Sequence, residues 1–71
     1  MDLQPHQLRV IEERDALKVK VDALEKFLHS PVFRGVDFDE QVRLMFQHLF
    51  MSQYHMVLGE RINAFSTPKA A

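Results

Sequence analysis

Histidine, serine and glycine residues are the places where this sequence could carry catalytic or metal chemistry. His48 and His55 stand seven residues apart, whereas histidine pairs that bind zinc from one helix are typically four apart. Ser52 lacks a nucleophile-elbow sequence around it. Gly35 and Gly59 do not form a glycine-rich phosphate loop. We therefore expect no catalytic residue, no metal ligand and no cofactor, and a protein that is not an enzyme.

Arginine, aromatic and methionine side chains indicate binding. Arg14 falls on an otherwise apolar helix face, where a buried charge is costly unless it is paired. It could pair with a carboxylate such as Glu60, or extend its charged head to solvent. Interface hot spots favour Arg and Tyr, and methionine adapts to irregular partners. We predict contacts with a target or with a second copy of the chain, without dividing the two, at Arg14, Phe46, Leu49, Phe50, Met51, Tyr54, Leu58, Arg61, Ile62 and Phe65.

The first element that must position these residues is a helix predicted over about residues 4–28. Pro5 suits a first helical turn, and Asp2 or Gln4 could cap it. No glycine or further proline interrupts the segment. A heptad pattern, with steps of four and three residues, runs through Leu3, Gln7, Val10, Arg14, Leu17, Val21, Leu24 and Leu28. The pattern predicts an ordinary amphipathic helix.

A second helix is predicted over about residues 38–65, after a connection over 29–37 and before a disordered tail over 66–71. Its apolar surface is about twice as wide as the single stripe of a surface helix. One apolar side contains Val42, Met45, Phe46, Leu49, Phe50, Met56 and Val57. The other side contains Met51, Tyr54, Leu58, Ile62 and Phe65. We expect a narrow strip to face water at Gln41, His48, Ser52, His55 and Gly59.

These elements predict a single all-α domain, an antiparallel two-helix hairpin that pairs as a homodimeric four-helix bundle. The chain has 71 residues and no cysteine. Scaffolds of this size usually need a disulfide, a metal or oligomerisation. Burying about 1,500 Å² of apolar surface at about 25 cal/mol/Å² contributes tens of kcal/mol before entropy. Pairing would therefore cover the second apolar side of the longer helix.

Charge and hydropathy exclude several classes of partner. Nine basic and ten acidic residues give a net charge of −1, so we expect no direct contact with nucleic acid. No apolar run approaches the roughly 18 residues of a membrane span, and the first residues do not resemble a signal peptide. We expect a soluble protein of the cytoplasm.

Several segments of the sequence together support a resemblance. They are Arg9-Val10-Ile11-Glu12-Glu13, Leu17, Leu24, Phe27, Ser30-Pro31-x-Phe33, Glu40-Gln41 and Tyr54-x-x-Val57-Leu58-Gly59-Glu60-Arg61-Ile62-x-x-Phe65. With these segments the chain resembles a group of very small phage-encoded helical-hairpin proteins, uncharacterised and related to crAss-phage proteins. It is also similar to the anti-quorum-sensing proteins of Pseudomonas phages, which are small dimeric helical hairpins.

The resemblance implies a host-takeover protein in the host cytoplasm. Such a protein would bind and inhibit host regulatory proteins: a quorum-sensing transcription activator and also a pilus assembly ATPase. Recognition of a helix in a groove, or masking of a DNA-binding domain, would be the mechanism.

Two alternatives stay open. The first is an anti-defence protein, which either inhibits an immune nuclease or acts as a sponge for a cyclic nucleotide signal. A sponge needs basic and aromatic groups that converge between subunits, and Arg9, Arg14, Arg43, Arg61 and Tyr54 are available. The second alternative is a hairpin with a purely structural or assembly role.

Overall fold

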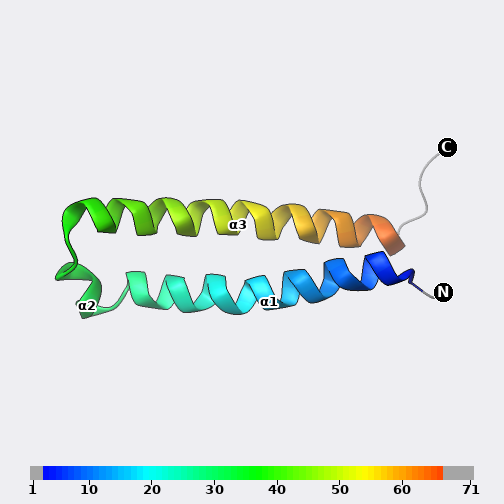
Figure 1. The fold of residues 1–71 in the computed structure, drawn as a ribbon, viewed down its shortest axis with the longest axis horizontal. Helices are drawn as coiled ribbons and strands as arrows, with labels where there is room; N and C mark the ends of the chain where they lie inside the picture. The colour runs from blue at the N-terminus through cyan, green and yellow to red at the C-terminus, as the bar shows by residue number, and fades with distance from the viewer. Residues whose placement is uncertain (1–2, 67–71) are drawn as a thin grey trace.

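The computed structural model describes residues 3–66, and this part of the chain is almost entirely helical. Helix α1 spans Pro5–Leu28, α2 spans Pro31–Arg34 and α3 spans Phe38–Ser66 (Figure 1). The prediction of an all-α fold is confirmed for the described residues, since none of them is in a strand. Ser66, predicted to begin a disordered tail, is the last residue of α3. The rest of that predicted tail and Asp2 lie outside the described residues.

Local hydrogen bonds define both ends of α1. The backbone N–H of Gln4 donates to Oε1 of Gln7 over 2.8 Å, and Pro5 occupies the first helical position, where a missing N–H costs nothing. At the other end the Ser30 hydroxyl donates to the carbonyl of Phe27 over 2.7 Å. The chain then enters α2 instead of continuing α1.

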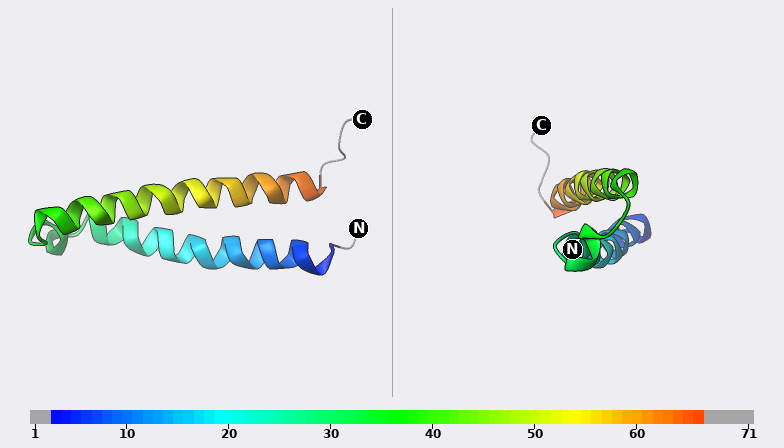
Figure 2. Two further views of the ribbon diagram at one scale, coloured as in Figure 1. Left: turned by 45° about the horizontal axis from the view of Figure 1, so that its top comes forward. Right: turned by 90° about the vertical axis from the view of Figure 1, so that its left-hand side faces the viewer.

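Helices α1 and α3 lie side by side and run in opposite directions, with α2 at the turn between them (Figures 1 and 2). The molecule measures 52 × 21 × 16 Å and has a radius of gyration of 16.2 Å. A compact domain of this length would have a radius of gyration of about 11 Å. The helix pair is a thin rod, so each helix has a side that the other cannot cover.

The face of α1 that packs on α3 is the predicted heptad face. Each residue of that pattern is buried or half-buried, from Leu3 to Leu28. Val10 is the most buried of them, with 6% of its surface exposed. The heptad spacing therefore identified the packing side of α1 correctly, although Gln7 and Arg14 are polar members.

The face of α3 that packs on α1 differs from our prediction. Leu58, which is fully buried, lies at its centre. Residues of this face follow one another in steps of three and four: Gln41, Leu44, His48, Met51, His55, Leu58, Ile62 and Phe65. The strip that we expected to face water (Gln41, His48, Ser52, His55 and Gly59) is half-buried here. That prediction is wrong, because the spacing of these residues places them beside Leu58 whatever their polarity.

The connection is attached to both long helices. Nε2 of Gln41 donates to the carbonyl of Phe33 over 2.8 Å, which links α3 to α2. The rings of Phe27 and Phe33 meet edge to face at 6.1 Å, which links α1 to α2. Asp37 accepts a bond from the backbone N–H of Asp39 over 3.2 Å at the start of α3. These contacts fix the direction in which α3 leaves the turn.

Candidate interaction surface

The side of α3 that faces away from α1 is apolar and open. Phe38 exposes 72% of its surface and Phe50 exposes 64%. Eight large apolar side chains of α3 are exposed: Phe38, Met45, Phe46, Leu49, Phe50, Tyr54, Met56 and Val57. Contiguous apolar patches above a few hundred Å² typically mark interaction sites. The open side of α3 is therefore the candidate site of this molecule.

The centre of this open side has a regular spacing of its own. We define the outer seam as Phe38, Val42, Met45, Leu49 and Met56, which lie opposite Leu58 at 100° per residue. The steps between these residues are four, three, four and seven, which is again heptad spacing. Val42, Met45 and Leu49, with Phe46, line a shallow hollow of about 350 Å³. The outer seam thus has the shape and the spacing of a surface that packs against another helix.

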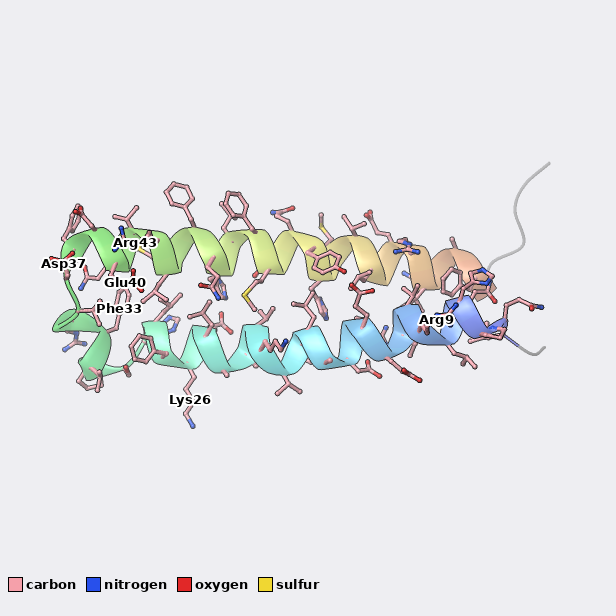
Figure 3. All side chains as sticks on the ribbon, viewed as in Figure 1. Arg9, Lys26, Phe33, Asp37, Glu40 and Arg43 are labelled. Carbon is pink, nitrogen blue, oxygen red and sulfur yellow. The ribbon has the colours of Figure 1, made fainter. Side chains whose placement is uncertain are left out.

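One edge of the open side carries aromatic rings between two arginines. We define the aromatic flank as Phe46, Phe50 and Tyr54, spaced four residues apart, with Arg43 before them and Arg61 after them. The rings of Phe46 and Phe50 are close to parallel, at 20°, with centroids 6.0 Å apart. Nε of Arg43 donates to Oε1 of Glu40 over 2.7 Å, and both lie near the turn in Figure 3. The flank therefore offers flat apolar surfaces beside two cationic groups.

Four of the predicted contact residues lie on the opposite side of α3. Met51, Leu58, Ile62 and Phe65 belong to the face that packs on α1. Their contact with another molecule stays a prediction. For Leu58, which is fully buried, it would require α1 and α3 to separate.

Arg14 is half-buried on the α1 face that packs on α3, and its partner differs from the one we suggested. Both its Nε and its Nη2 donate to Oδ1 of Asp15 over 3.2 Å. The suggested pairing with Glu60 is not found. Asp15 is the next residue along the chain, so Arg14 forms this ion pair while 34% of its side chain stays exposed.

The helix–helix interface contains histidines but no metal-binding group. Nε2 of His55 is buried without a hydrogen-bond partner. Within residues 3–66, no set of three or more His, Asp or Glu side chains is placed to hold a metal ion. His55 is therefore a polar residue in a packing position.

The arginines suggested for a nucleotide pocket do not converge within one helix pair. Figure 3 shows Arg9 near the termini and Arg43 near the turn, at opposite ends of the rod. Arg43 and Arg61 share an edge of α3, but they stand about 27 Å apart at 1.5 Å per residue. A site that uses Arg43 together with Arg9 or Arg61 therefore needs an extended ligand or a second chain.

Phe38, Arg43, Met45 and Met56 were absent from the predicted contact residues. The signal that could have found the three apolar ones is the second heptad pattern of α3, from Phe38 to Met56. Arg43 could have been found because it precedes Phe46 by one helical turn. Separately, no helix among residues 3–66 is long and apolar enough to cross a membrane.

Comparison with known proteins places the chain in a family. A family model described as Sequestin matches residues 4–64. The chain is also 43% identical over 60 residues to an uncharacterized 7.5 kDa protein from the denB–rIIB intergenic region of Enterobacteria phage T4, covering 84% of this chain and 94% of that protein. No solved structure matches it significantly. The chain belongs to the Sequestin family, and the matches agree with the resemblance to small phage proteins; they do not support the resemblance to anti-quorum-sensing proteins.

Proposed function

We propose that this Sequestin acts in the host cytoplasm as a phage protein that binds and sequesters a nucleotide-derived host signal. In this proposal the protein works by binding and not by catalysis. Its folded unit is an antiparallel two-helix hairpin, and its active form is a homodimer of two hairpins. The family description supports sequestration, and the T4 relative supports a phage setting.

The aromatic flank is the observation that favours a nucleotide. Two nearly parallel phenyl rings on a solvent-facing helix edge form a platform on which a planar base can stack. Proteins that bind unpaired bases use such platforms, and arginines contact the phosphates that the base carries. Arg43 and Arg61 stand at the two ends of the flank. A net charge of −1 argues against long nucleic acids, whose binding depends on many basic residues. A small ligand with few phosphates fits this balance better.

Thermal-shift and calorimetric titration with mononucleotides, dinucleotides and their cyclic forms tests the proposal. A ligand at about 100 times its dissociation constant stabilises the folded state by about 2.7 kcal/mol, so the melting temperature should rise by several degrees. Phe50→Ala and Arg43→Gln should each weaken binding at least tenfold. Val19→Ala, which removes an exposed apolar side chain from α1, is the matched control and should bind like the native chain. No shift with any of these nucleotides would contradict the proposal.

A host regulatory protein is the second candidate for what is sequestered. The exposed methionines of α3, Met45 and Met56, favour it, because flexible thioether side chains adapt to irregular protein surfaces. A transcription regulator that accepts α3 in a groove would be such a target. The quorum-sensing activator and the pilus assembly ATPase are specific forms of this candidate that rest on the resemblance alone.

Affinity capture from a host lysate distinguishes the two candidates. The tagged native chain should retain a transcription regulator that a Met56→Asp variant loses and a Val19→Asp variant keeps. If the same regulator is retained by all three proteins, the contact does not involve the open side of α3, and this candidate fails.

A further inference from the structure

We propose that the outer seam of α3 binds the outer seam of a second copy in antiparallel orientation, and that this pairing brings the two aromatic flanks together on one face. The dimer would then contain a single composite site. The pairing itself does not depend on the proposed ligand. The assignment of the composite site to a nucleotide rests on the function proposed above.

The exposed area fits a second copy. The eight exposed apolar side chains of α3 expose between 44% and 72% of their surface. If each side chain offers about 150–250 Å², the range for aromatic residues, together they leave roughly 650–1,100 Å² of surface in water. A stable interface of standard size buries about 800 Å² on each partner. The open side of one α3, which is the outer seam together with the aromatic flank beside it, is therefore about as large as one half of a stable dimer interface. The partner would cover the seam, and the flank would border the groove that the ligand occupies.

The outward side of α1 is too polar to cover the open side of α3, so the matching surface is the α3 of a second copy. The outward side of α1 is charged; Lys18 and Asp22 form an ion pair of 3.0 Å there, and Lys26 points away from α3 in Figure 3. Its exposed apolar residues, Leu8 and Val19, are isolated among charges. Only α3 presents a continuous apolar side, and a symmetric dimer pairs a surface with itself. In the dimer each α3 would lie between its own α1 and the α3 of the partner subunit.

Charge selects the antiparallel orientation. Asp37, Asp39 and Glu40 lie at or just before the start of α3, where Glu40 is paired with Arg43. Arg61 lies near the end of α3, next to Glu60. Parallel pairing would place acidic groups beside acidic groups and Arg61 beside the partner's Arg61. Antiparallel pairing instead brings the partner's Arg61 toward the acidic start of α3, and it also opposes the two helix dipoles. The register that places Phe38 level with the partner's Met56 buries the whole seam and puts the two-fold axis near residue 47.

Symmetry then determines where the aromatic flanks lie. A two-fold axis that makes two adjacent helices antiparallel is perpendicular to both, so the same edge of each helix appears on the same face of the pair. Phe46, Phe50 and Tyr54 of both chains would line one groove. In the register given above, Phe50 would lie within a turn of the partner's Arg43. Each base-sized platform would therefore have a cation supplied by the other subunit.

Pulsed electron–electron double resonance on a spin-labelled dimer directly tests whether the two α3 helices are antiparallel. The chain has no cysteine, so Ala64→Cys, on the exposed end of α3, gives a single labelling site. Antiparallel pairing about residue 47 predicts a distance of about 50 Å at 1.5 Å per residue. Parallel pairing predicts less than about 25 Å, because packed helices lie 8–10 Å apart. The shorter distance, or no dipolar signal at micromolar concentration, would overturn the inference.

A pair of charge substitutions tests the seam. Leu49→Asp should raise the dimer dissociation constant at least about 100-fold, because it places an unpaired charge inside the interface. Val19→Asp makes the same change on α1 and should leave the dimer intact. Circular dichroism shows whether Leu49→Asp stays helical; if it unfolds, the spin-label distance in the native background still decides the orientation. Equal dimerisation by both variants would contradict the seam assignment.

Binding and pairing can fail separately in these experiments. An antiparallel dimer that binds none of the nucleotides would retain the interface and contradict the proposed function. A monomer that binds a nucleotide through its own aromatic flank would retain the function and contradict the interface. Mixing Arg43→Gln and Phe50→Ala chains gives a third readout. In a mixed dimer, the intact Phe50 of one chain lies near the intact Arg43 of the other chain. Half of the composite site is therefore restored if the two groups act across the interface.

Discussion

At the residue scale, polarity was a poor guide to which side chains of α3 face water. Gln41, His48 and His55 look solvated by residue type, yet they occupy the stripe of Leu58. Gln41 has a structural reason to be there, since it donates to the carbonyl of Phe33. His55 has none that we can identify, because its Nε2 is buried without a partner.

The buried Nε2 of His55, which has no hydrogen-bond partner, leads to a prediction about the free energy of unfolding. Replacing it with leucine removes a buried polar atom that forms no hydrogen bond and adds apolar contact, so His55→Leu should raise the free energy of unfolding by about 1 kcal/mol. Urea denaturation at constant protein concentration measures the change. His29→Leu is the control, because His29 bonds to the carbonyl of Glu25 at an exposed helix end and should show no gain. A destabilised His55→Leu would mean that the imidazole has a partner in solution.

For Gln41 we predict the opposite effect, a loss of stability on replacement by leucine. Its amide donates a hydrogen bond from α3 to the carbonyl of Phe33, at 2.8 Å, so Gln41→Leu leaves a part-buried carbonyl without this donor. We expect a loss of about 1 kcal/mol in the free energy of unfolding. Gln47→Leu, at an exposed position whose amide meets only the sulfur of Met51 at 3.7 Å, should change it by less than about 0.5 kcal/mol. Equal effects of the two substitutions would contradict the structural role given to Gln41.

At the element scale, the positions of the helices could be predicted from proline, glycine and periodicity. The face by which each helix packs could be predicted for α1 but not for α3. Pro5 and Pro31 begin the two N-terminal helices where the sequence indicates, and one heptad pattern identified the face of α1. In α3 two heptad patterns coexist, one around Leu58 and one along the outer seam. The sequence alone does not say which of them meets α1, because both contain apolar side chains, and the polar residues beside Leu58 were assigned to solvent. The aromatic flank could not be recognised before the packing face of α3 was known.

Gly59 offers a test of α3 as a continuous helix. It lies inside α3 with ordinary helical backbone, and a Cβ added there meets nothing within 4 Å. Since glycine in a helix interior is about 0.5–1 kcal/mol less favourable than alanine, Gly59→Ala should stabilise the protein by that amount. The shift of the denaturation midpoint measures it. A loss of stability would indicate that another chain approaches the backbone at Gly59 in the space beside its Cα that one chain leaves empty.

At the scale of the whole molecule, the account depends on a shortage of covering surface. Two long helices in one layer bury few side chains deeply; among the described residues only Leu58, at 0%, and Val10, at 6%, expose so little of their surface. The radius of gyration of 16.2 Å reflects the same geometry. In the dimer that we propose, the second copy buries the open side of α3, which supplies the stabilisation that a chain without cysteine does not gain from disulfides. The proposed sequestration does not require a large hydrophobic core, because the protein would bind through an exposed helix surface.

Sedimentation velocity of the native chain at micromolar concentration tests this central claim most directly. The account predicts a single elongated species with a mass twice the 8.4 kDa of one chain, which dissociates when Leu49→Asp is introduced. A folded helical species of 8.4 kDa at the same concentration would contradict it, because the open side of α3 would then be stable in water without a partner.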